Sequence, residues 1–122
     1  SEVYGLVSKK DVPINENNRL NPASPYAVSK LFQDILSQTY YRNFGLKIII
    51  TRMFSYFNVR RFNLFSSNWT KQMVDIEKNR SKILYHGNLN SIRAILDIDD
   101  AMEAYWMAAS KGKIGEICKS ES

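Results

Sequence analysis

"SPYAVSKLFQDILSQTYYRNFGLKIIITRMF", residues 24–54, predicts a helix followed directly by a buried strand. Ser24 is a suitable N-cap, and Pro25 suits the first helical position, where its missing backbone N–H costs nothing. Gly45 supplies a C-terminal stop, so the helix is expected to end at about Phe44.

Helical periodicity divides the side chains of this helix into two sets. The apolar set, with one threonine, comprises Val28, Leu31, Phe32, Ile35 and Thr39. The opposite side carries Tyr26, Lys30, Gln33 and Ser37.

The run 46–54 after the helix is short, β-branched and almost continuously apolar, which is typical of a strand buried on both faces of a parallel sheet. A helix followed by such a strand is half of a βαβ unit. Residues 6–23 read as a long polar loop, which in a compact domain is often functional. Together these segments predict an α/β fold.

The remaining segments continue the alternation of helices and strands. We expect helices from Ser66 to about Asn79 and from about Asp99 to Lys111, and strands at 82–87, 93–98 and 115–118. Only about two of these strands look buried, and the opening "SEVYG" resembles the tail of a strand and a turn. The chain is therefore expected to be a piece of a larger protein.

Composition restricts the class of protein. With 44% hydrophobic and 24% charged residues, the 122-residue chain resembles one soluble domain, and its longest apolar run is well short of a membrane span. The lone Cys118 excludes an internal disulfide and a multi-cysteine zinc site, so we expect a cytoplasmic protein without a metal. The net charge of +5 favours anionic partners. A basic polyanion-binding module is one alternative, although the charges are scattered and nucleic acid is not expected.

Tyr26 and Lys30 are four residues apart on the predicted helix and project from the same face. A lysine ammonium beside a phenol favours the phenolate, which makes tyrosine usable as an acid/base near neutrality. The same ammonium could hold a ribose hydroxyl. The spacing alone also fits two exposed neighbours on a helix.

"SEVYG" (1–5) and "SPYAVSK" (24–30) together resemble the extended branch of the short-chain dehydrogenase/reductases, the NAD-dependent epimerase/dehydratase family. In that branch a strand ends in S-T-S-E-L-Y-G and the catalytic motif reads S-P-Y-x-x-S-K. Residues 50–61 and 87–117 resemble later segments of the same branch, and the chain is most similar to its GDP-mannose 4,6-dehydratases.

The resemblance implies the C-terminal part of a Rossmann-type doubly wound parallel sheet, plus part of a small substrate-binding domain. Residues 1–63 and about 96–118 would belong to the NAD(P)-binding domain, and about 64–95 to the substrate-binding domain. The glycine-rich N-terminal half that cradles the cofactor is absent from the sequence, so the chain alone is expected to be inactive.

The resemblance also assigns roles to individual residues. Tyr26 would remove the proton of the sugar 4-hydroxyl, Lys30 would bind the nicotinamide ribose, and Glu2 would take the C5 proton and help expel the C6 hydroxyl. The implied cofactor contacts are Tyr26, Lys30, Tyr56 and Arg61. The implied substrate contacts are Ser1, Ser55 and Arg93. Three departures weaken the cofactor and substrate contacts: Ser55 replaces an asparagine, Tyr56 a histidine, and Ala94 an aspartate.

The implied reaction is dehydration of a nucleotide sugar, GDP-mannose by subfamily, through bound NADP or NAD. An epimerase or reductase of the same superfamily is the alternative enzyme. Glu2 favours a dehydratase because elimination needs that carboxylate. The branch commonly pairs subunits through the Tyr/Lys helix, so the full-length protein is expected to be a homo-oligomer without membrane partners.

Overall fold

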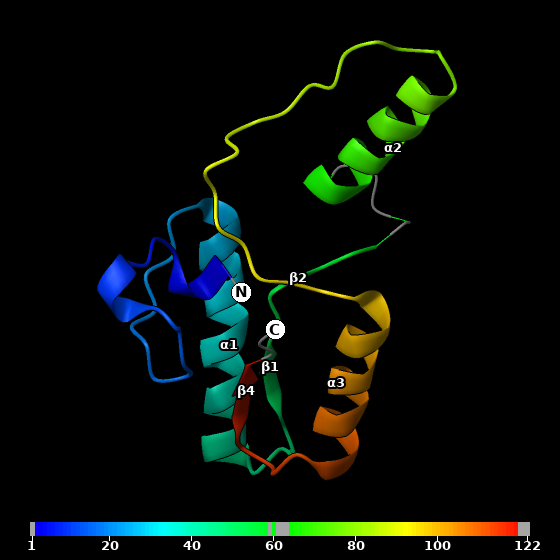
Figure 1. Ribbon diagram of the computed structural model, residues 1–122. Helices are drawn as coiled ribbons and strands as arrows, with labels where there is room; N and C mark the ends of the chain where they lie inside the picture. The colour runs from blue at the N-terminus through cyan, green and yellow to red at the C-terminus, as the bar shows by residue number, and fades with distance from the viewer. Residues whose placement is uncertain (1, 59, 61–63, 120–122) are drawn as a thin grey trace.

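The computed structural model describes residues 2–58, 60 and 64–119 and has helices on both sides of parallel strands (Figure 1). The helical elements are η1 (Glu2–Tyr4), η2 (Lys9–Asp11), α1 (Pro25–Phe44), α2 (Phe65–Glu77) and α3 (Ile98–Lys111). The strands are β1 (Ile50–Arg52), β2 (Ser55–Tyr56), β3 (Ile95–Leu96) and β4 (Ile117–Lys119).

Helix α1 has the predicted bounds, and its two caps explain them. The Ser24 hydroxyl accepts a hydrogen bond from the backbone N–H of Ala27 (3.0 Å), and Pro25 occupies the first turn. At the other end Gly45 is left-handed (φ 66°), and its N–H donates to the carbonyl of Tyr41. Both helix ends are therefore determined by local sequence.

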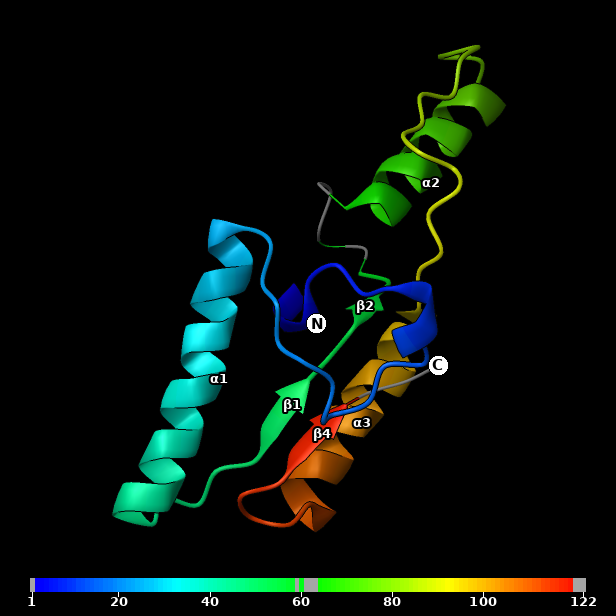
Figure 2. The same cartoon turned by 90° about the vertical axis from the view of Figure 1, so that its left-hand side faces the viewer.

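The strands pair in parallel, as the sequence predicted. β1 pairs with β4, with Ile50 opposite Ile117, and β2 pairs with β3, with Ser55 opposite Ile95. Figures 1 and 2 show β1 and β4 side by side between α1 and α3, the arrangement of a doubly wound fold. α2 and the chain that follows it extend away from these layers.

The strand expected at 46–54 differs from the structure in its length and in its burial. Only Ile50–Arg52 forms a ladder, and Ile50 and Thr51 are half-buried instead of fully buried. Within the described residues β1 has a single neighbouring strand, β4, so backbone outside this short register has no ladder partner. The strand expected at 93–98 is likewise confined to Ile95–Leu96.

The strand expected at 82–87 is absent. Both backbone groups of Tyr85 instead bond to the Gln72 side chain on α2: Gln72 Nε2 donates to the Tyr85 carbonyl (3.1 Å), and the Tyr85 N–H donates to Gln72 Oε1 (2.6 Å). A side-chain amide has thus taken the place of a strand partner. In the opening "SEVYG" the predicted turn is present: Glu2–Tyr4 is a 3₁₀ turn closed by the Gly5 N–H on the Glu2 carbonyl.

The apolar stripe of α1 does not face the interior of this chain. Val28, Phe32 and Ile35 are 53%, 63% and 51% exposed, whereas Ala27 and Asp34 are the buried positions of the helix. Periodicity identifies which side chains share a face, but the tertiary neighbours decide which face is covered. Here the covered face carries a carboxylate.

Candidate active site

Tyr26 and Lys30 lie side by side in the first turns of α1. The Lys30 ammonium is 5.5 Å from the centroid of the Tyr26 ring, and its Nζ donates to Gln33 Oε1 at 3.3 Å. The Tyr26 side chain is 58% exposed. The pair is therefore open to a ligand, with the ammonium of one residue above the ring of the other.

The turn that carries Glu2 is hydrogen-bonded to the segment just before the same helix. The backbone N–H of Asn21 donates to the carbonyl of Val3 (3.0 Å), while Val3 and Tyr4 are both only 2% exposed. Glu2 itself is exposed. Gly5 makes this close approach possible, since it has φ +61° and a Cβ there would lie 1.6 Å from the Asn21 carbonyl oxygen.

The predicted substrate and cofactor contacts further along the chain gather at the second strand pair. Ser55 and Tyr56 form β2, and Arg93 lies two residues before the Ile95 that faces Ser55 across the ladder. Ser55 and Arg93 are exposed and Tyr56 is half-buried.

Tyr105 on α3 approaches this strand pair. Burial raises the pKa of the Tyr105 phenol, and the nearby Tyr56 raises it further, against a hydrogen bond with Thr51 that lowers it.

Two predicted residues, Ser1 and Arg61, lie outside the described residues. Among the residues that the structure describes, there is no group of three or more His, Cys, Asp and Glu side chains arranged for a metal ion. In the same part of the chain, no helix has the length and apolarity that crossing a membrane requires.

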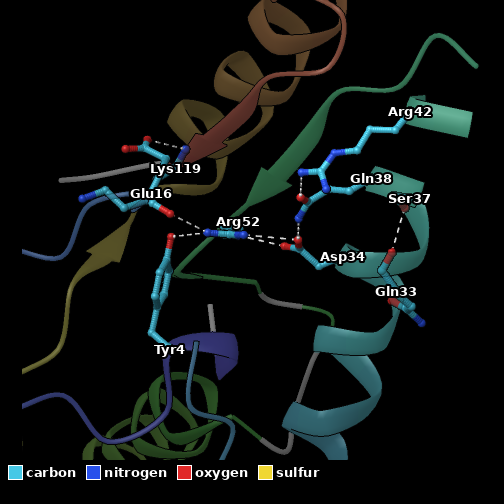
Figure 3. A network of polar contacts seen from close by, with 9 residues as sticks. All are labelled: Tyr4, Glu16, Gln33, Asp34, Ser37, Gln38, Arg42, Arg52 and Lys119. Atoms are coloured by element: carbon cyan, nitrogen blue, oxygen red, sulfur yellow. Dashed lines mark hydrogen bonds and ion pairs between the residues drawn. The ribbon is translucent and has the colours of Figure 1, made fainter. Parts of the chain in front are cut away.

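The sequence did not predict a buried polar network centred on Arg52 (Figure 3). Arg52 Nε and Nη2 donate to the two carboxylate oxygens of Asp34 at 2.8 and 3.2 Å, while Nη1 donates to the Tyr4 hydroxyl (3.0 Å) and the Glu16 carbonyl (2.9 Å). The Arg52 and Asp34 side chains are 4% and 5% exposed. The sequence signal for this network was Arg52 itself, a charged residue inside an apolar run. A charge buried there needs a partner of opposite charge.

The network keeps Arg52 charged. Burial alone would lower the pKa of the guanidinium, but its hydrogen bonds to Asp34 and Tyr4, with their charge interactions, leave that pKa above its ordinary value. Asp34 also accepts a hydrogen bond from Gln38 Nε2 at 2.7 Å. The carboxylate and the guanidinium thus have the several partners that a buried ion pair requires.

Comparison with known proteins identifies the family. The family model described as "GDP-mannose 4,6 dehydratase" matches residues 1–121. The chain belongs to the GDP-mannose 4,6-dehydratase family. The predicted membership of the epimerase/dehydratase group is therefore confirmed.

Individual relatives of this family member are enzymes of nucleotide-sugar chemistry. GDP-mannose 4,6-dehydratase from Vibrio cholerae is 31% identical over 108 residues, covering 88% of this chain and 28% of the relative. GDP-6-deoxy-D-mannose reductase from Pseudomonas aeruginosa is 26% identical over 121 residues, covering 95% and 39%. Other relatives include dTDP-glucose 4,6-dehydratases.

Solved structures confirm the Rossmann-type α/β fold. RMD from Pseudomonas aeruginosa, complexed with NADPH, superposes with a TM-score of 0.94 at 26% identity, covering 99% of this chain and 42% of that one. This member of the GDP-mannose 4,6-dehydratase family thus spans well under half the length of these relatives. The cofactor in that structure, NADPH, belongs to the NAD(P) class that the family resemblance implied.

Proposed function

We propose that this chain carries the acid/base residues of an NAD(P)-dependent nucleotide-sugar 4,6-dehydratase, with GDP-mannose as the substrate. The observation that carries the proposal is the Tyr26–Lys30 pair, exposed at the start of α1 with Lys30 Nζ 5.5 Å from the phenol ring. The Glu2 turn, hydrogen-bonded to the segment ahead of that helix, supports a site with a second acid/base group.

The residues at this site fit a nicotinamide nucleotide. The Lys30 ammonium reaches an exposed amide oxygen of Gln33, so it can exchange that partner for a ribose hydroxyl without leaving a buried group unpaired. Tyr56, with Arg61, would complete the contacts to the cofactor. When bound, NAD(P) supplies a hydride acceptor for the sugar C4 and a hydride donor for C6.

The chain's own side chains would move the protons. Tyr26, with the Lys30 ammonium beside its ring, removes the proton of the 4-hydroxyl. Glu2 then takes the proton from C5 and returns a proton to the C6 hydroxyl, which leaves as water. A single carboxylate serves both steps because a base that has gained a proton is an acid.

The projecting arm formed by residues 64–95 would hold the nucleotide end of the substrate. A shallow, open hollow of about 350 Å³ lies between α2 and the chain that follows it, lined in part by Phe65, Trp69 and His86. The Phe65 and Trp69 rings pack edge to face with centroids 5.9 Å apart. Ser55 and Arg93, at the base of the arm, would contact the sugar and the diphosphate, for which a guanidinium is well suited. We assign the nucleotide to the arm and the diphosphate to its base.

The decisive experiment incubates the complete gene product containing residues 1–122 with GDP-mannose, dTDP-glucose or UDP-glucose and catalytic NAD or NADP. Mass spectrometry then detects loss of one water from the sugar. We expect dehydration of GDP-mannose, its loss in Tyr26→Phe and Glu2→Gln, and normal rates in Tyr40→Phe, which removes an exposed hydroxyl elsewhere on α1. If none of the three nucleotide sugars lost water, the proposal would be overturned.

A reductase is the second candidate, favoured by the likeness to the Pseudomonas reductase. A reductase would consume NADPH in proportion to a 4-keto-6-deoxy sugar and would tolerate Glu2→Gln, because reduction of a ketone removes no C5 proton. The same variant therefore separates the two reactions.

The proposed enzyme would act in the cytoplasm as a homo-oligomer. Apolar side chains exposed along α1 support pairing of two copies through this helix, as the resemblance to the family implied. Cys118, a free thiol, is compatible with a reducing compartment.

A further inference from the structure

The two segments that carry the proposed catalytic groups meet at one guanidinium. Arg52 bonds to Asp34, one helical turn beyond Lys30 on α1, and to Tyr4, two residues beyond Glu2 in η1. It also holds the loop between them through the Glu16 carbonyl (2.9 Å). Figure 3 shows the three partners converging on the Arg52 side chain from different elements.

Geometry makes this junction rigid. The contacts to Asp34 are two-point, at 2.8 and 3.2 Å, so the plane of the guanidinium is fixed relative to α1. The Tyr4 ring is 2% exposed and stacks on Phe54 with an interplanar angle of 3° and centroids 6.3 Å apart. The Tyr4 hydroxyl therefore has little freedom to move while it bonds to Nη1.

The 3₁₀ turn η1 links the position of Tyr4 to that of Glu2. Tyr4 ends η1, and the Gly5 N–H closes the turn on the Glu2 carbonyl at 3.0 Å. Displacing Tyr4 would displace the backbone that carries the Glu2 carboxylate, whereas Tyr26 and Lys30 are held independently by α1.

We propose that Arg52 and Tyr4 are positioning residues, which hold the Glu2 turn at a fixed place relative to Tyr26 and Lys30. This inference rests on the proposed function. It assigns to the Tyr4 hydroxyl an effect on the elimination step, in which Glu2 acts, and not on cofactor binding. Productive geometry is sensitive to such displacements, and an error of about 1 Å can cost about a hundredfold in rate.

Tyr4→Phe is the sharpest test, because it deletes one hydroxyl and keeps the Phe54 stacking and the Arg52–Asp34 ion pair. Tyr40→Phe is the matched control on α1. In the complete gene product we expect Tyr4→Phe to lower kcat for dehydration by about tenfold. The dissociation constant for NAD(P) should stay within about twofold, as expected if α1 is undisturbed.

A kinetic isotope effect separates positioning from simple destabilisation. With substrate deuterated at C5, the isotope effect on kcat should be larger in Tyr4→Phe than in wild type or Tyr40→Phe, because removal of the C5 proton has become slower. A kcat and isotope effect equal to those of Tyr40→Phe would overturn the inference while leaving the proposed function intact.

Hydrogen exchange provides a readout that needs no activity. The Gly5 amide should exchange about tenfold faster in Tyr4→Phe, while the Gly45 amide at the end of α1 keeps its wild-type rate. Unchanged exchange at Gly5 would refute the positioning of the Glu2 turn even if no sugar were dehydrated. Absence of dehydration in the wild type would overturn the proposed function alone.

Discussion

Asp34 of α1 and Arg52 of β1 form a two-point ion pair, at 2.8 and 3.2 Å, that joins the helix to the sheet in the interior of the molecule. Fully buried apolar residues are few in the described chain, namely Val3, Tyr4, Ala27 and Ala101. Loss of the buried ion pair should therefore affect stability strongly.

Removal of one partner should be costly. Arg52→Met leaves the Asp34 carboxylate buried without its cation, so we expect the free energy of unfolding to fall by about 3–5 kcal/mol in urea titrations. The pair Asp75–Arg80, 3.7 Å apart with the arginine exposed, is the control, and Arg80→Met should change stability by about 0–1 kcal/mol. The double variant Asp34→Leu/Arg52→Met should recover much of the loss. Equal losses in the Arg52 and Arg80 variants would contradict this account.

Gly5 should tolerate no side chain. Gly5→Ala places a Cβ 1.6 Å from the Asn21 carbonyl oxygen at a φ of +61°, so it combines a steric clash with an unfavourable backbone conformation. Gly45→Ala has a similar φ of +66° but open space around the Cβ, so it isolates the conformational cost of about 1–2 kcal/mol. Thermal unfolding should rank Gly5→Ala as clearly the more destabilised. Equal melting temperatures would show that the turn at Asn21 moves aside freely.

Tyr105 should make stability depend on alkaline pH. Burial, reinforced by Tyr56, raises the pKa of Tyr105 above its ordinary value of about 10, so the unfolded chain ionises first. Its contribution is fully present below about pH 10 and is lost as the pH rises through the higher folded-state value.

The measurement compares the unfolding free energy of wild type and Tyr105→Phe at about pH 8 and about pH 11. Wild type should lose more stability over this interval than the variant. Tyr85→Phe, at a side chain that is 73% exposed, should follow wild type. Parallel losses in wild type and Tyr105→Phe would exclude this role of Tyr105.

Lys30 should matter for the cofactor more than for folding. Its ammonium bonds to the exposed Gln33 side chain, so Lys30→Met should leave the melting temperature nearly unchanged. Loss of a hydrogen bond from a charged group costs about 1.5–3 kcal/mol, which predicts NAD(P) binding weaker by roughly tenfold to a hundredfold. Fluorescence titration of the complete gene product tests this, with the exposed Lys47→Met as control. Wild-type affinity in Lys30→Met would remove Lys30 from the proposed site.

The exposed stripe of α1 should control the oligomeric state. Phe32 is 63% exposed, so Phe32→Asp should preserve the helical circular dichroism while it places a charge in the proposed contact between copies. Sedimentation velocity should then report dissociation of the complete gene product to monomers. Ile92→Asp, at a residue that is 98% exposed on the arm, should leave the assembly intact. An intact oligomer in Phe32→Asp would exclude α1 from the interface.

Local signals predicted the helices well. Ser24, Pro25 and Gly45 determine the ends of α1 through contacts within a few residues, and Asp97 caps α3 through the N–H of Asp99 (2.9 Å). Strands depend on distant partners. Residues 82–87 have the composition of a strand, yet Gln72 on α2 satisfies the backbone of Tyr85.

The candidate site was predictable only in part. Tyr26 and Lys30 meet because helical spacing alone brings them together. No periodicity could reveal that Arg52 reaches Tyr4, 48 residues away, or that Asp34 lies on the covered face of α1. For the same reason the exposure of Phe32 could not be predicted, since it depends on what lies against the helix.

The network around Arg52 also has an order of assembly. The Glu16 carboxylate accepts a hydrogen bond from the backbone N–H of Lys119 in β4, a contact across 103 residues of chain, while the Glu16 carbonyl holds Arg52. Contacts of such long sequence separation form slowly, because the entropy of closing the loop is lost before the contact stabilises anything. During synthesis α1 can form before β4 exists, whereas Glu16 gains its bond to β4 only after residue 119 has been added. The polar junction that joins the two proposed catalytic segments is thus completed later than the helix that it holds.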